Sequence, residues 1–208
     1  MSRYAHVAFT DDVRRVQEER GSAAAMERLL GTDAGRADRL GPAEAGFIGA
    51  RDGFYLGTVS ETGWPYIQFR GGPPGFVHVL DEETLAFLDV RGNRQYITAG
   101  NIRGNDRVSL FFMDYAHRTR LKVLGRAEIR DAGEFPGTGG RPEDVRTEGH
   151  EEWLMVVRVE GLAWNCAKHI TPRFSEAELA DALAGVYERI AELEEENKEL
   201  RSRLGARD

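Results

Sequence analysis

The pattern of hydrophobic and polar positions changes twice along the chain. Up to about residue 46, short apolar runs alternate with charged residues at helical spacing, as in "DDVRRVQEER" and "SAAAMERLL". Ser22 stands where a helix N-cap is favoured, and "GPAEAGFIGAR" predicts a further short helix with Pro42 in its first turn. The sequence therefore predicts an N-terminal helical segment over residues 1–46.

From about residue 53 to 163 the pattern becomes that of an all-β domain. Seven runs are rich in β-branched and aromatic residues: "FYLGTVSE", "PYIQFRG", "FVHVLD", "TLAFLDV", "RVSLFFMDY", "RLKVLGRAEIR" and "EWLMVVRVEGLAW". Short turns separate most of them, which predicts a closed barrel or a sandwich. The stretch "DAGEFPGTGGRPEDVRTEGHE" before the last run predicts a long surface loop.

From Ser175 onward the apolar spacing alternates between four and three residues, which is a heptad repeat. Position a holds Leu183, Ile190, Asn197 and Leu204, and position d holds Leu179, Val186, Leu193 and Leu200. Ser175 followed by Glu178 resembles a capping box at the start of this helix. We predict a coiled-coil helix over residues 175–208.

A parallel homodimer suits this tail best. Asn197 at position a can pair with its mate only in a parallel, in-register arrangement. In the same arrangement Arg189 faces the partner's Glu194, and Glu196 faces the partner's Arg201. The alternative is an amphipathic helix packed on its own domain.

Composition removes several classes of function. The net charge of −7 argues against a general nucleic-acid binder, since nothing neutralises a run of phosphates. No apolar run approaches a membrane span, and the first residues lack the apolar middle of a signal peptide. Cys166 is the single cysteine, so no internal disulfide can form. We expect a cytoplasmic protein without a membrane segment.

Two groups of residues could carry chemistry. The β region contains Arg70, Arg94, Arg103, Arg107 and Arg120, whose planar guanidinium groups suit phosphate. Spacing alone favours scattered surface arginines, but strand ends can converge in a small barrel.

The second group is "WNCAKHITPRF", which runs from Trp164 to Phe174. Cys166 and His169 have no second Cys or His cluster near them, so a metal site is not expected. A lone cysteine beside a strand end is more often a small buried residue than a nucleophile.

These stretches together resemble a known family. "FYLGTVSETGWPYIQFRG", "TLAFLDVRGNRQYITAGNIRGNDRVSLFF" and "RLKVLGRAEI" resemble the FMN-binding split barrel of the pyridoxamine 5′-phosphate oxidase superfamily. The resemblance covers roughly residues 47–174. It is closer still to bacterial relatives of that oxidase that carry "W-N-C-x-x-H-I-T-P-R-F". The implied fold is mainly β, a split barrel with N-terminal helices and a C-terminal coiled-coil helix.

The resemblance also implies a cofactor site for FMN. In that family, residues matching Arg70, Arg94 and Gln95 contact the FMN phosphate, with Asn93 beside them. Leu88 and Asp89 would line the flavin, and Arg120 falls where a glutamine contacts it in the oxidase. A tryptophan and an arginine matching Trp164 and Arg173 reach the flavin from the second subunit of a homodimer.

The resemblance predicts the cofactor rather than the substrate. The oxidase binds its vitamin phosphate with a basic, serine-containing segment, and "DAGEFPGTGGRPEDV" does not match it. We expect an FMN-dependent oxidoreductase acting on a small molecule. His169 would be either the proton donor or acceptor, or a residue that only positions its loop. The alternative function is a non-catalytic flavin-binding or sensing protein with an interaction tail. Deazaflavin and haem are the alternative cofactors.

Overall fold

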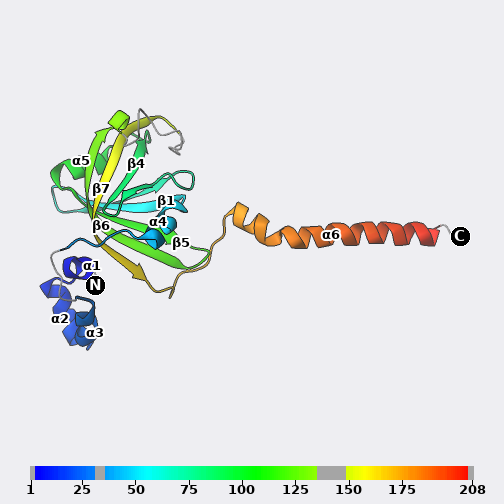
Figure 1. Ribbon diagram of the computed structural model, residues 1–208, viewed down its shortest axis with the longest axis horizontal. Coiled ribbons are helices and arrows are strands. Elements are labelled where there is room, and N and C mark those ends of the chain that lie inside the picture. The colour runs from blue at the N-terminus through cyan, green and yellow to red at the C-terminus, as the bar shows by residue number, and fades with distance from the viewer. Residues whose placement is uncertain (1–2, 31–35, 135–148, 206–208) are drawn as a thin grey trace. The chain divides into compact units, whose positions relative to one another are not determined.

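The computed structural model describes residues 3–30, 36–134 and 149–205 and divides the chain into two units. The first comprises Met1–Asp114 and Arg118–Lys168, and the second comprises Tyr115–His117 and His169–Asp208 (Figure 1). Most of the long loop expected after residue 131 lies outside the described residues. Within the described ranges, no helix is both long enough and apolar enough to cross a membrane.

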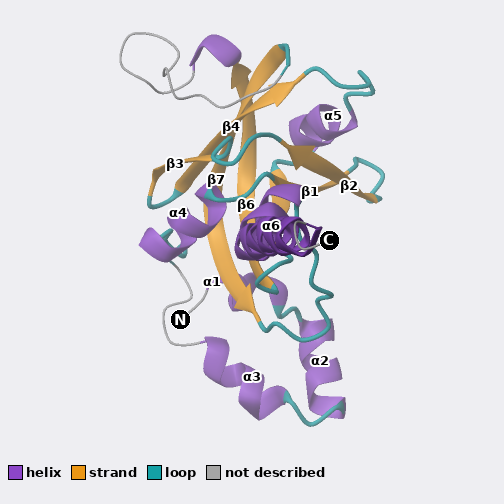
Figure 2. Cartoon of the chain, turned by 90° about the vertical axis from the view of Figure 1, so that its right-hand side faces the viewer, coloured by secondary structure: helices purple, strands orange, loops and turns teal. Residues whose placement is uncertain are grey.

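The N-terminal segment is helical, as predicted. It forms α1 (Arg3–Ala8), α2 (Asp11–Glu19), α3 (Ala23–Leu30) and α4 (Pro42–Gly49). The Thr10 hydroxyl accepts from the Val13 N–H at 3.4 Å and so caps α2. The Glu44 carboxylate accepts from the Gly41 N–H at 3.0 Å at the start of α4. Helix α1 lies against β7, whereas α2 and α3 extend away from the sheet (Figure 2).

The predicted strands are also confirmed, and they form one antiparallel sheet. The strands are β1 (Gly53–Val59), β2 (Pro65–Gly71), β3 (His78–Asp81), β4 (Thr84–Val90), β5 (Arg107–Asp114), β6 (Thr119–Asp131) and β7 (Glu151–Asn165). Their order is β2-β1-β5-β6-β7-β4-β3. Helix α5 (Ile97–Gly104) connects β4 to β5, and a short 3-10 turn, η1 (Ala132–Glu134), follows β6.

The sheet curls into a split barrel. Strands β2 and β4 are far apart in the strand order, yet the Arg70 Nη1 atom on β2 lies 2.6 Å from the Asp89 Oδ1 atom on β4. The long strands β6 and β7 shift register between Leu124 and Gly125, and such a bulge bends a strand. A Cβ atom at Gly125 would lie 2.6 Å from the Arg158 carbonyl oxygen, so this close approach requires glycine.

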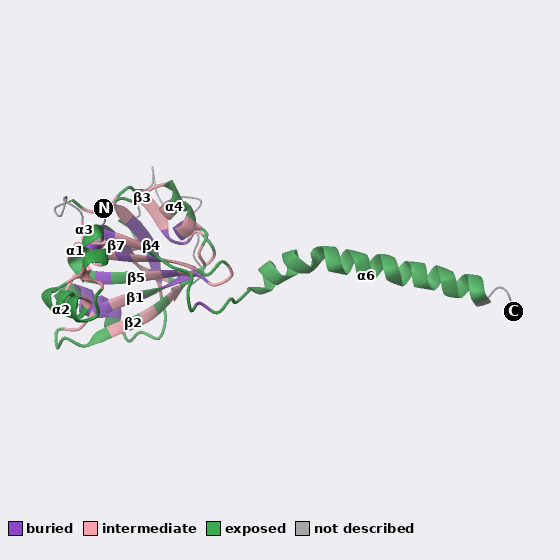
Figure 3. Cartoon of the chain, turned by 90° about the horizontal axis from the view of Figure 1, so that it is seen from below, coloured by how far each residue is buried: buried purple, intermediate pink, exposed green. Residues whose placement is uncertain are grey.

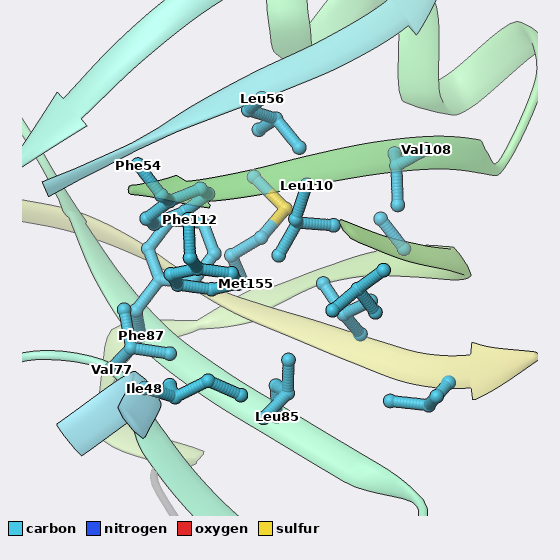
Figure 4. Packing of buried hydrophobic residues seen from close by; sticks show 14 of the residues in the cluster. Ile48, Phe54, Leu56, Val77, Leu85, Phe87, Val108, Leu110, Phe112 and Met155 are labelled. Atoms are coloured by element: carbon cyan, nitrogen blue, oxygen red, sulfur yellow. The ribbon is translucent and has the colours of Figure 1, made fainter. Parts of the chain in front are cut away.

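The barrel interior is filled by apolar side chains from β1, β4, β5, β6 and β7 (Figure 4). Phe54 is central, because its ring contacts those of Phe76, Phe87 and Phe112 at centroid distances of 6.0, 5.2 and 4.9 Å. Met155 from β7 is fully buried in the same cluster. The curled sheet therefore encloses a large core, and a second, smaller cluster around Leu88 and Leu154 packs beside the strand ends that form the candidate site.

The second unit contains α6 (Glu176–Gly205). The capping box predicted at its start is present. The Ser175 hydroxyl accepts from the Glu178 N–H at 3.2 Å, and the Glu178 carboxylate accepts from the Ser175 N–H at 2.7 Å. The helix is exposed along its described length (Figure 3), including the leucines of the heptad pattern.

Candidate functional site

A pocket of about 130 Å³ lies where β2, β4 and β7 meet the loop that leads into α5. Its lining residues come from the three strands, the loop and the first turn of α5: Tyr66, Gln68, Arg70, Asp89, Val90, Gly92, Asn93, Arg94, Gln95, Tyr96, Ile97, Thr98, Ala99, Glu152 and Trp153. Polar and charged side chains predominate in this set, in contrast to the apolar barrel interior.

Strand alternation explains which residues reach the pocket. On β2, Tyr66, Gln68 and Arg70 line the pocket, while Ile67 and Phe69 between them are exposed. On β4, Asp89 lines the pocket, while Leu88 packs into a separate cluster with Ala86, Leu154 and Val156. On β2 a single-residue step thus separates the pocket from the exposed outer face, whereas on β4 the adjacent Asp89 and Val90 both line the pocket beside the buried Leu88.

The loop over the pocket has an uncommon backbone. Arg94 and Tyr96 have φ angles of 61° and 56°, in the left-handed region that residues other than glycine rarely adopt. Such residues cost on the order of 1 kcal/mol each and persist where surrounding contacts hold them. The Asn93 side-chain oxygen accepts from the Gln95 N–H at 3.1 Å. The Tyr96 hydroxyl donates to Glu152 at 3.2 Å, and its ring packs against Trp153.

This loop presents the N-terminus of α5 to the pocket. Ile97, Thr98 and Ala99 form the first turn of that helix and all three line the pocket. The N-cap residue, Tyr96, makes no side-chain hydrogen bond to this turn. A helix N-terminus carries backbone N–H groups without intrahelical acceptors and a partial positive charge, which together favour an anion.

The charges in the pocket are mixed. Arg70 is paired with Asp89, but its Nε atom is buried and has no hydrogen-bond partner among the described residues. Burial raises the pKa of the Asp89 carboxyl, the Arg70 guanidinium opposes that shift, and the nearby Glu152 adds to it. Glu152 is itself held by the Arg91 Nε atom at 3.3 Å. Arg94 is exposed at the rim of the pocket.

The structure brings together five of the residues expected at the cofactor: Arg70, Asp89, Asn93, Arg94 and Gln95. Two other arginines of the candidate group, Arg103 and Arg107, line a different depression with Arg126. The group of arginines is therefore divided between separate places on the barrel.

Arg120 and Trp164 lie at the opposite ends of β6 and β7 from the pocket. Arg120 pairs in register with Asn165, whereas the pocket is at the Glu152 end of β7. The Arg120 guanidinium donates to the Asn165 side-chain oxygen at 2.6 and 3.1 Å, with that amide oriented to accept. The Trp164 indole donates to Glu44 at 2.7 Å. Within one copy these two residues do not line the pocket.

The second unit contains the remaining candidates, His169 and Arg173. His169 is exposed and has a φ angle of 64°. The Arg173 guanidinium lies over the Tyr115 ring, 5.1 Å from its centroid. In the first unit Cys166 is exposed, so the expectation of a small buried cysteine was wrong. The reason is that β7 ends at Asn165, which leaves Cys166 outside the sheet.

Sequence reasoning missed several lining residues: Tyr66, Gln68, Tyr96, Thr98, Glu152 and Trp153. Alternation along β2 from Arg70 could have found the first two. Trp153 reaches the pocket because it pairs in register with Asp89, and no local signal predicts that non-local pairing. Among the described residues, no group of three or more His, Cys, Asp or Glu side chains could hold a metal ion.

Comparison with known proteins gives a family for this architecture. The family model of pyridoxamine 5′-phosphate oxidase matches residues 40–146, about half of the chain. No curated protein sequence is similar enough to count as a match.

Solved structures show more distant similarity. The HupZ protein of Group A Streptococcus is 16% identical, with a TM-score of 0.48 over 65% of this chain and 99% of that one. General stress protein 26 of Bacillus anthracis is 17% identical, with a TM-score of 0.40 over 62% and 92%. An FAD-binding protein of Mesorhizobium loti is 15% identical, with a TM-score of 0.38 over 61% and 94%. Similarities this low say nothing about a shared ligand.

Proposed function

The chain belongs to the pyridoxamine 5′-phosphate oxidase family, and we propose that it is an FMN-binding oxidoreductase whose pocket beneath residues 92–96 holds the FMN phosphate. The observation that carries this proposal is the buried Nε atom of Arg70, which has no hydrogen-bond partner within the described ranges and lies in a pocket also lined by the first turn of α5. A buried donor of this kind is costly unless a ligand or water satisfies it.

The donor set suits a phosphate. Arg70 and Arg94 supply guanidinium groups, and the first turn of α5 supplies backbone N–H groups. Asp89 fixes the Arg70 guanidinium through its Nη1 atom and leaves the Nε edge for the ligand. The carboxylates of Asp89 and Glu152 reduce the positive charge of the pocket. The affinity for a phosphate would therefore depend on hydrogen-bond geometry as well as on charge.

The pocket size supports a site shared between two copies. Ligand pockets usually enclose roughly 300–1,000 Å³, whereas this one holds about 130 Å³. That volume accommodates the phosphate end of FMN but not its ring system. We propose that a homodimer completes the site, with the partner subunit's Trp164 and the partner subunit's Arg173 beside the flavin.

The outer face of β2 supports such a dimer. On β2, Ile67 and Phe69 are 69% and 54% exposed, and Phe69 packs edge-on against Tyr55 of β1, which is 38% exposed. Large apolar side chains gathered on one surface mark interaction sites.

Bound FMN would supply the redox chemistry, by accepting and donating electrons through its isoalloxazine ring. The chain would bind and orient it. Arg70 and Arg94 would hold the phosphate, and residues 92–96 would exclude water from it. The His169 imidazole would give or take the substrate proton, since imidazole can do both near neutral pH.

We expect Arg94→Ala to weaken FMN binding by about 1–3 kcal/mol, because a charge-assisted contact is lost from an exposed residue that is not needed for folding. Quenching of FMN fluorescence on titration measures the affinity. Arg103→Ala is the matched control, since Arg103 lines a different depression. Equal affinity in both variants would remove Arg94 from the site.

Turnover separates the proposal from its alternative, a non-catalytic flavin-binding or sensing protein, which the exposed apolar seam of α6 favours. FMN-loaded protein would be mixed with NADH or NADPH and an electron acceptor, and donor oxidation followed. Oxidation faster than with free FMN supports the oxidoreductase. Tight FMN without turnover supports the alternative. Binding of deazaflavin or haem in preference to FMN would correct the cofactor.

A further inference from the structure

We propose that α6 forms a parallel, in-register, two-stranded coiled coil with α6 of a second copy of this chain. The proposal concerns the second unit only and does not depend on the flavin. It rests on the exposed apolar seam, the polar residue within that seam and the charges on either side of it.

The seam is continuous and narrow. Its apolar members, Leu179, Leu183, Val186, Ile190, Leu193, Leu200 and Leu204, are all between 38% and 67% exposed. They follow the a and d positions of the heptad repeat, a stripe narrower than that of a helix packed on a globular domain. A 30-residue helix with this seam uncovered would gain much of its stability by burying it.

Asn197 selects the parallel orientation. In a parallel pair, each Asn197 amide meets that of its mate, and the two can hydrogen-bond to each other. In an antiparallel pair with Leu179 opposite Leu204, Asn197 would face Val186, and its amide would be buried without a partner. The side of the helix around Asn197 also carries a shallow depression bounded by Ile190, Leu193 and Arg201, where a partner side chain could insert.

The flanking charges favour the same register. In a parallel pair, Arg189 faces the partner's Glu194, and Glu196 faces the partner's Arg201. Within the described part of the chain, Glu194, Glu196 and Arg201 form no ion pair. Arg189 forms an ion pair with Glu192 of its own helix, at 2.8 Å. Such exposed pairs contribute little energy, but they set partner choice and orientation.

Cysteine cross-linking in the full chain tests the arrangement. Cys166→Ser removes the native thiol, and Leu204→Cys then places one thiol at an a position near the end of α6. In a parallel pair this thiol meets its own mate. In the antiparallel alternative the two thiols are about 37 Å apart, because 25 residues separate positions 179 and 204 at ~1.5 Å each. Glu195→Cys, on the outer face of the coil, is the matched control.

We expect mild oxidation to convert Leu204→Cys into a covalent dimer at least about tenfold faster than Glu195→Cys. Leu200→Cys, at a d position, provides a second reading if the first variant perturbs the helix end. Equally slow disulfide formation in the Leu204→Cys, Leu200→Cys and Glu195→Cys variants would overturn the proposed pairing of the helices. A disulfide between mixed Leu179→Cys and Leu204→Cys chains, faster than either alone, would overturn the parallel orientation.

Asn197→Leu completes the test. We expect this variant to lose its single oligomeric state, with species larger than a dimer in light scattering, because nothing then penalises other arrangements. An unaltered, purely dimeric protein would show that Asn197 does not specify the pairing.

Discussion

Replacing Arg70 with methionine is expected to abolish measurable FMN binding and to lower the free energy of unfolding by about 3 kcal/mol at neutral pH. The stability loss arises because Asp89, whose side chain is only 11% exposed, would keep its charge without the cation that lies 2.6 Å away. Urea unfolding measures the stability, and FMN fluorescence measures the binding.

The stability loss should depend on pH in a defined direction. In the variant, burial and Glu152 raise the pKa of Asp89 without opposition from Arg70. A carboxyl whose pKa is raised in the folded state does not destabilise the fold while it is protonated. It lowers the free energy of unfolding as the pH rises through that pKa, because the folded state must then hold the unpaired charge. The difference in the free energy of unfolding between this variant and the wild type should therefore become smaller at acidic pH. A difference that grows on acidification would contradict this account of the pair.

The double variant Arg70→Met/Asp89→Leu separates folding from binding. Replacing both partners of a buried ion pair by apolar residues is often neutral or stabilising, so this variant should recover most of the stability. It should still fail to bind FMN, because the guanidinium is absent. Recovery of FMN binding together with stability would show that Arg70 acts only through the fold.

Phe54→Ala is expected to lower the free energy of unfolding by about 4 kcal/mol. Phe54 is 1% exposed and packs against three other aromatic rings, so its truncation leaves a cavity between strands that close the barrel. Urea unfolding followed by tryptophan fluorescence gives the value.

Trp64→Ala, at a side chain that is 76% exposed, is the control and should change the free energy of unfolding by less than about 1 kcal/mol. Because Trp64 contributes to the tryptophan signal, circular dichroism should follow both variants. Similar losses for the two substitutions would show that the ring cluster around Phe54 is not the centre of the core.

Local patterns predicted most of the fold. The β-branched and aromatic content of "PYIQFRG" predicted the bounds of β2, and the Ser175–Glu178 spacing predicted the start of α6. These elements obey rules that involve a few neighbouring residues. The closure of the barrel could not be predicted in this way, because the contact between Arg70 and Asp89 depends on how far the whole sheet curls.

The candidate site was predicted only in part, for the same physical reason. Arg94 and Gln95 were found because their loop resembles a family segment. Trp153 was not found, because it reaches the pocket through its register with Asp89 on another strand. Arg120 and Trp164 lie at the far strand ends, so their predicted contact with the flavin requires a second copy.

The most direct measurement is the absorption spectrum of the purified protein after FMN is added and unbound FMN is removed by gel filtration. We predict flavin bands that co-elute with a dimer at about one FMN per chain and that are absent from Arg70→Met/Asp89→Leu. A protein that stays colourless, or a double variant that retains as much FMN as wild type, would contradict the assignment of this pocket to the FMN phosphate.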